Sequence, residues 1–443
     1  MANTMNAPTD TVRKHFFDRV LGIERHEYVA VAWSFLYFFC VLSAYYILRP
    51  IRETMGVGSG TNTIPFLFVG TFIAMLVLTP VFGWVTSRYP RKVFLPWVYL
   101  FFISNILIFW FVFSERIDDG QNHVWLGRTF FIWISVFNLF VVSVFWSFMA
   151  DIYTREQGRR LFGLLSSGGS IGALLGSALT TIAVTRIGFE NLFPVSAILL
   201  AFAIVCIHQL KKWVVHEHSD NVDKTVASNK PLGGNPLSGI THVFGSKYFT
   251  AIAISSIIAS LLGTALYMFR AELVATSSMD TNQQTQFFAV INLASSFFTI
   301  LGQMFLVRHV VHKFGIGVSL AILPTLSVLF FIWVALEPTL LVIALADVAR
   351  RATGFTFGKP TTDMLYSVVT PEEKYKTKNF IDTAVYRFGD VVGVWTIRFM
   401  MGLGITGVSL VMVPFAAIWA LVALWLGRDY RRRARELRQS GVI

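Results

Sequence analysis

The sequence predicts an all-α membrane protein with twelve transmembrane helices in two pseudo-symmetric six-helix bundles. Of its 443 residues, 55% are hydrophobic and only 14% are charged, too few polar side chains to cover a soluble protein of this size. Twelve stretches are about 20 residues long and mainly apolar, the length at which a helix crosses a bilayer. Lysine and arginine gather in alternate connections, as they do on the cytoplasmic side of membrane proteins.

The first segment, residues 1–27, is charged throughout and shows no cleavage site behind an apolar core, so we expect no removable signal peptide. Within it, Phe16, Phe17, Val20 and Leu21 lie near one helical face beside basic residues. This pattern is typical of an interfacial helix. A simple cytoplasmic cap is the alternative.

The two bundles follow in order and are separated by the longest polar stretch. We expect an N-terminal bundle over 28–210, a cytoplasmic linker over 211–247, a C-terminal bundle over 248–427 and a basic cytoplasmic tail over 428–443. The predicted spans are 28–48, 64–86, 93–113, 129–150, 161–184, 190–210, 248–269, 286–307, 315–336, 338–358, 379–400 and 406–427. Both termini are then cytoplasmic.

The net charge of +12 is explained by orientation and by contact with anionic lipids at the cytoplasmic face, so we expect no nucleic-acid partner. The tail "RDYRRRARELR" is typical of a lipid anchor and topology signal. Cys40 and Cys206 fall inside spans, where they pack as small apolar groups. No Cys/His cluster or Ser/His/Asp set is apparent, so we expect no metal, no cofactor and no enzymatic activity.

The fifth predicted span contains "SSGGSIGALLGS", in which Gly168, Gly172 and Gly176 recur at every fourth position. Small residues at this spacing indicate close packing of two helices. A substrate-facing role for Ser166 or Ser167 is the alternative.

Charged residues at bilayer depth are costly and therefore mark functional candidates. At 1.5 Å per residue, five such residues fall near the midplane of spans ten and eleven: Asp347, Arg350, Arg351, Arg387 and Asp390. Their spacings of three and four residues allow mutual neutralisation on one helix face. The arginines nevertheless outnumber the acids, and guanidinium groups suit phosphate or carboxylate ligands, which favours an anionic substrate.

A second group lies at the outer ends of the spans. "SAYYILRPIRE" closes the first span with Arg49, Arg52 and Glu53, and Arg270 and Glu272 end the seventh at a matching depth. Either all of them are snorkelling helix ends, or Arg52 and Glu53 line an outer mouth, with Pro50 bending the helix inward. Lys359 and Arg398 are two further basic residues within or at the ends of spans.

Several motifs resemble known transporters. "GWVTSRYPRKVFL" resembles the short-loop motif of the major facilitator superfamily, with Gly83, Arg88, Arg91 and Lys92 in place. "YYILRPIRE", residues 145–176 and above all "KPTTDMLYSVVTPEEKYKTKNFIDTAVYRFGD" resemble the ATP:ADP antiporter family, the nucleotide transporters of plastids and intracellular bacteria. The resemblance covers nearly the whole chain in order. It implies a major facilitator fold and secondary transport by alternating access.

Acids expected from that family are replaced here. Ile134 stands where the fourth span of nucleotide transporters has a glutamate, "SLLGTALYMF" in the seventh span has no acid, and Lys359 replaces an aspartate. The chain is therefore expected to be a divergent member, and a substrate other than a nucleotide stays open.

These observations together predict a monomeric secondary-active transporter of the bacterial inner membrane. It would move an anionic, nucleotide-like phosphorylated solute by exchange or by proton coupling. Expected substrate contacts are Arg49, Arg52, Arg350, Arg351, Lys359 and Arg387, and expected coupling or gating acids are Glu53, Asp347, Asp382 and Asp390. Alternatives are a transporter or flippase of another anion, such as a cell-wall or lipid precursor, and a non-transporting receptor or regulator.

Overall fold

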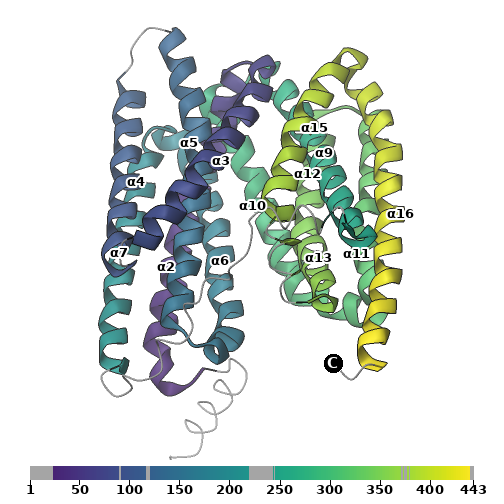
Figure 1. Cartoon of the computed structure of the whole chain (residues 1–443). Helices are drawn as coiled ribbons and strands as arrows, with labels where there is room; N and C mark the ends of the chain where they lie inside the picture. The colour runs from purple at the N-terminus through teal and green to yellow at the C-terminus, as the bar shows by residue number, and fades with distance from the viewer. Residues whose placement is uncertain are drawn as a thin grey trace, which may run out of the picture. The chain divides into compact units, whose positions relative to one another are not determined.

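The computed structural model describes residues 23–88, 91–115, 120–218, 243, 245–370, 373, 377–378 and 380–439. Most of the predicted N-terminal segment, most of the linker and the end of the tail lie outside these residues. Everything regular in the described part is helical, as the sequence predicts (Figure 1).

Six long helices make up the first half of the chain. After the short helix η1 (Arg25–Glu27) they are α2 (Tyr28–Gly58), α3 (Ile64–Arg88), α4 (Arg91–Ser114), α5 (Gly120–Ile152), α6 (Arg155–Ile187) and α7 (Leu192–His218), with η2 (Thr61–Thr63) before α3. Thr154 caps α6 by accepting a hydrogen bond from the backbone of Gln157, whose side chain bonds back to the Thr154 backbone.

The second half is more broken. Its regular helices are α9 (Lys247–Ala275), α10 (Thr281–Phe305), α11 (Val307–Leu336), α12 (Leu340–Thr353), α13 (Lys359–Leu365), α15 (Tyr386–Met400) and α16 (Gly404–Gln439). Two π-helical turns interrupt the predicted spans ten and eleven, η3 (Gly354–Gly358) and η5 (Ile381–Val385). Short 3-10 turns are η4 (Tyr366–Val368) and η6 (Met401–Leu403).

The expected twelve spans agree with these elements. Ten stretches of the described residues are long and apolar enough to cross a membrane. One of them, Tyr386–Gln439, contains both α15 and α16, which separate where Gly404 takes a φ of 71° that suits glycine. Span ten escapes the length test because η3 divides it into α12 and α13. The described helices are thus consistent with twelve crossing segments.

The chain forms two compact units. Unit 1 comprises Met1–Ile51, Leu78–Asp118 and Ile134–Asn229, and unit 2 comprises Arg52–Val77, Asp119–Trp133 and Lys230–Ile443. The ends of α2, α3 and α5 thus pack as part of unit 2. The division of the chain into bundles at 210 and 248 remains a prediction.

In unit 1, α6 lies directly against the backbone of α2. A Cβ on Gly168, Gly172 or Gly176 would collide with the carbonyl oxygen of Phe35, Phe39 or Ser43, respectively. The Ser43 hydroxyl donates to the Gly172 carbonyl at 3.1 Å. The predicted close packing through glycines at every fourth position is therefore confirmed.

In unit 2, α9 lies against both α15 and α16, and α11 runs along α16 (Figure 1). The hydrophobic core of unit 2 consists of aliphatic and aromatic side chains such as Leu262, Phe269, Phe331 and Trp419. Large apolar side chains elsewhere, including Leu336 and Phe399, are 80% exposed, as expected of surfaces that face lipid.

Candidate functional site

A group of charged side chains is buried in unit 2, and Arg270 of α9 is at its centre. Its side chain is only 2% exposed. Its Nη1 donates to Asp347 Oδ2 at 2.5 Å and its Nη2 to Glu53 Oε2 at 3.4 Å. The guanidinium thus joins α9 to the end of α2 and to α12.

Asp347 of α12 is a shared carboxylate, 1% exposed. Besides Arg270, it accepts a hydrogen bond from Arg351 Nε at 3.0 Å on Oδ1, the contact that a spacing of four residues predicts. Arg351 Nη1 also donates to Asn292 Oδ1 of α10 at 3.1 Å. We call Glu53, Arg270, Asp347 and Arg351 the paired cluster.

Arg350 is held differently from its neighbour. Its Nη2 lies 4.0 Å from Asp347 Oδ1, beyond hydrogen-bonding distance, and its Nε is buried without a hydrogen-bond partner among the described residues. The guanidinium lies on α9 at Gly263, where a Cβ would be 2.9 to 3.1 Å from Nη2, Cζ and Nη1. Its side chain remains 19% exposed, so its donors are available to a ligand.

Arg387 of α15 is the second accessible arginine, 39% exposed. Its Nη1 lies 3.4 Å from Asp390 Oδ2, and the Ser260 hydroxyl donates to the other oxygen of that carboxylate. Gly389 and Gly393 let α15 approach α9 closely at this level. We call Arg350 and Arg387 the open arginines.

The arginines at the end of the first span lie in different environments. Arg52 pairs with Glu53 at 3.3 Å and its Cζ lies 4.0 Å from the centre of the Phe131 ring, a cation–π distance. Arg49, in unit 1, donates to the Tyr46 hydroxyl at 3.2 Å.

Lys359 belongs to a separate network. It pairs with Asp382 at 2.6 Å and with Asp363 at 3.4 Å, and Lys378 pairs with Asp363 at 2.9 Å. Lys359 opens α13 and Asp382 lies in η5, so each follows or occupies a π-turn. Such turns occur frequently at functional sites.

The sequence placed Asp347 beside Arg350 and Arg351 correctly, but it missed the role of Arg270. The snorkelling alternative does not apply to Arg270, because its guanidinium is buried between two carboxylates. A signal was present, since Arg270 was an unexplained charge in an apolar span. Its partners are 77 and 217 positions away in sequence, which no helical spacing reveals.

The arrangement offers guanidinium donors rather than a metal site or a catalytic set. Among the described residues, the one group with suitable spacing for a metal is Glu24, His26 and Glu27. Arg160 already pairs with both of its carboxylates, at 3.1 and 2.9 Å. An anion is the ligand that the open arginines fit.

Comparisons with known proteins identify the family of the chain. A family model described as "Major Facilitator Superfamily" matches residues 34–394. ADP,ATP carrier protein 2 from Chlamydia pneumoniae is 22% identical over 94% of this chain and 91% of its own. The resemblance to the ATP:ADP antiporters is thereby confirmed as that of a divergent member.

Solved structures show the same fold. A POT family transporter in complex with a thioalcohol-conjugated peptide has a TM-score of 0.62 at 12% identity and covers 90% of this chain and 96% of its own. A D-xylose-proton symporter has a TM-score of 0.62 at 13% identity and covers 90% and 97%. These relatives are transporters and not enzymes.

Proposed function

Because the chain belongs to the Major Facilitator Superfamily and is a membrane transporter of that type, we propose that it carries an organic anion by alternating access. Its place would be the inner membrane of a bacterium, with both termini in the cytoplasm. The match extends over most of the chain, so both six-helix halves take part.

The observation that carries the proposal is the environment of Arg350. Its guanidinium has no hydrogen bond to Asp347 and keeps an exposed edge, while Arg270 and Arg351 are already bound to that carboxylate. A buried guanidinium with free donors binds a phosphate or carboxylate group well. Arg387 supplies the second positive charge.

The other charged residues take supporting roles in this proposal. Arg270, Arg351 and Asp347 position α12, while Arg52 and Glu53 of unit 2 lie near the outer end of the pathway. Arg49 of unit 1 is a further expected contact. Lys359 and Asp382 form a gating pair at the opposite end. Phosphorylated, nucleotide-like solutes are the first substrates to test, because the curated relatives are named ADP,ATP carriers.

Thermal unfolding of the purified protein tests the proposal directly. The panel contains nucleotides, other phosphorylated metabolites, dicarboxylates and cell-wall precursors, each measured with the parent, Arg350→Ala and Arg387→Ala. The matched control is Arg398→Ala, which removes the other arginine of α15. We expect one class of anion to stabilise the parent and Arg398→Ala and to lose that effect in both test variants.

Equal stabilisation of all four proteins would mean that the open arginines are not the site. Once a ligand is known, uptake into proteoliposomes distinguishes the modes of coupling. Exchange requires the anion inside the vesicles, whereas proton coupling requires only a pH gradient.

A further inference from the structure

The last helix, α16, continues without interruption beyond its apolar part. α16 runs from Gly404 to Gln439, and its first basic residue, Arg428, comes directly after the apolar residues that end with Leu426 and Gly427. At Gly427 the helix touches the backbone of Gly317 in α11, leaving no room for a side chain. The position of the basic turns relative to α11 is therefore fixed by a backbone contact in unit 2.

Two of the arginines that follow, Arg432 and Arg433, pair with a buried carboxylate of the same helix. Asp429 is only 7% exposed and accepts hydrogen bonds from Arg432 and, at 2.9 Å, from Arg433 Nε. The Cζ of Arg433 lies 4.6 Å from the centre of the Tyr248 ring, which attaches α16 to α9.

Four other arginines of α16 have no ion pair among the described residues, and three of them line a common pocket. Arg428, Arg431 and Arg435 are exposed, and none of them has an ion pair within the part of the chain that the structure describes. They line one pocket together with Arg432, Glu436 and Gln439. At spacings of three, four and seven residues they repel each other on neighbouring turns, and an anion would relieve that repulsion.

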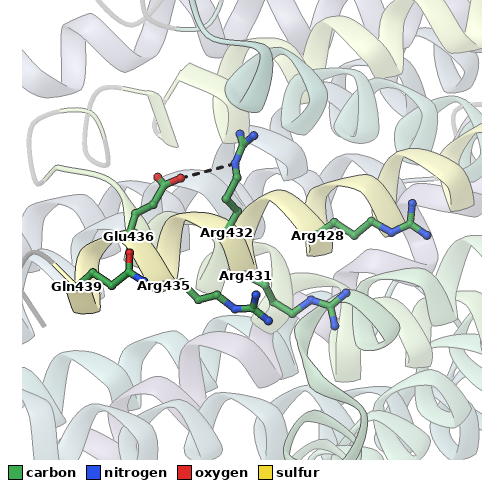
Figure 2. A pocket seen from close by; sticks show the side chains of 6 residues that line it. All are labelled: Arg428, Arg431, Arg432, Arg435, Glu436 and Gln439. Atoms are coloured by element: carbon green, nitrogen blue, oxygen red, sulfur yellow. Dashed lines mark ion pairs between the residues drawn. The ribbon is translucent and has the colours of Figure 1, made fainter.

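The direction of these side chains indicates where the anion lies. Figure 2 shows Arg428, Arg431 and Arg435 extending along the helix toward its apolar part, whereas Arg432 and Glu436 project from the opposite side. Helical side chains lean toward the N-terminus of their helix, and in α16 that direction leads back to the membrane. Ile418, Leu421 and Trp425, at 49%, 66% and 41% exposure, form the lipid-facing row that continues into these arginines.

We propose that Arg428, Arg431 and Arg435 form a binding site for the phosphate headgroup of an anionic membrane lipid. The lipid's chains would lie along the exposed row of Ile418, Leu421 and Trp425, and its phosphate would bridge guanidinium groups on successive turns. This site is separate from the open arginines and does not depend on the substrate.

The test measures the thermal unfolding of the full chain in lipid nanodiscs of phosphatidylcholine with or without added phosphatidylglycerol. The test variant carries Arg428→Gln, Arg431→Gln and Arg435→Gln. The matched control carries Arg159→Gln, Arg186→Gln and Lys313→Gln, which removes the same charge from other exposed positions. Glycerol phosphate in solution forms a further arm with the parent protein.

We expect phosphatidylglycerol to raise the Tm of the parent and of the control and to leave that of the test variant unchanged. Each basic residue near an anionic surface contributes about a fivefold gain in affinity, so the triple substitution weakens apparent lipid binding by about 100-fold. Equal Tm values for the parent and the test variant in phosphatidylcholine alone would show that the variant folds.

Three outcomes would overturn the proposal. The first is that phosphatidylglycerol does not raise the Tm of the parent. The second is that the control loses the stabilisation as fully as the test variant does, which means diffuse attraction, and the third is that glycerol phosphate stabilises the parent fully, which means a site for a soluble anion. If the test variant unfolds in phosphatidylcholine, single substitutions are compared by native mass spectrometry of retained lipid. Retention equal to that of the parent in all three would then contradict the proposal.

Discussion

The paired cluster and the open arginines share only the helix α12, and they differ in how their charges are satisfied. In the paired cluster, Arg270 and Asp347 are 2% and 1% exposed and bonded to each other. Arg350 and Arg387 are 19% and 39% exposed. Arg350 lies 4.0 Å from Asp347, and Arg387 donates one long hydrogen bond of 3.4 Å to Asp390. Adjacent residues of one helix are therefore held differently: Arg351 is bonded to Asp347 and Asn292, whereas Arg350, the proposed ligand contact, has no hydrogen bond to Asp347.

The largest effect should follow from breaking the paired cluster. Replacing Arg270 by methionine leaves Glu53 and Asp347 buried without their shared partner, which costs about 3–5 kcal/mol for a buried pair. We expect a large drop in thermal unfolding temperature in detergent. Arg398→Met is the control. If both variants lowered the unfolding temperature equally, Arg270 would not have the structural role described.

Removing an open arginine should separate binding from stability. Arg350→Ala is expected to weaken anion binding about 10-fold or more, since hydrogen bonds to charged groups contribute about 1.5–3 kcal/mol, while the free energy of unfolding changes little. Arg351→Ala should lower the free energy of unfolding and change anion binding little, because it removes one of the two arginines bonded to the buried Asp347. Calorimetric titration and denaturant unfolding measure both quantities. If the two variants behave alike, the distinction between the neighbours is wrong.

A smaller effect is expected at Gly263, the support of the Arg350 guanidinium. Gly263→Ala adds a methyl group at 2.9 to 3.1 Å from that guanidinium, so we expect affinity for the anion to fall about 3- to 10-fold, as for coupled neighbours. Combined with Arg350→Ala, it should cause no further loss. Gly402→Ala, which meets nothing within 4 Å, is the control. A loss that persists in the double variant would place the effect elsewhere.

The smallest effect has the opposite sign. Asp390→Asn removes the charge that faces Arg387 at 3.4 Å but keeps an oxygen for the Ser260 hydroxyl. Because Arg387 is partly exposed, releasing it should strengthen anion binding by only about two- to fivefold, in line with a solvated ion pair. Asp363→Asn, in the Lys359 network, should leave binding unchanged. Weaker binding in Asp390→Asn would mean that the carboxylate orients Arg387.

The sequence predicts features that depend on one helix at a time, because its patterns extend along a single helix. Apolar length predicted the helices, and spacing along one helix predicted the approach of Asp347 to Arg351 and the glycine contacts of α6 with a neighbour. The bond of Arg270 to Asp347 joins two helices, so no period along the chain reveals it. The support of Arg350 by Gly263 is equally invisible, because it depends on the absence of a side chain in another helix.

The π-helical turns could not be predicted from these patterns either. The predicted span at 338–358 treats the segment as one regular helix, yet its last five residues form the π-turn η3, and α13 continues beyond it to Leu365. Gly354 and Gly358 lie against Leu323 of α11, while Gln303 of α10 donates to the Phe355 carbonyl at 3.1 Å. Contacts with neighbouring helices therefore support the π-turn, and the local sequence alone does not specify it.

The η3 turn also fixes the angular register of everything that follows it. A π-turn accommodates one residue more than an α-turn, and one residue of an α-helix corresponds to a rotation of about 100°. The side of the helix that carries Asp347 and Arg351 is thus offset from the side that carries Lys359 and Asp363. Shortening this turn by a single residue would rotate Lys359 out of line with Asp382, so the length of the Gly354–Gly358 segment is itself a constraint on how this transporter can evolve or be redesigned.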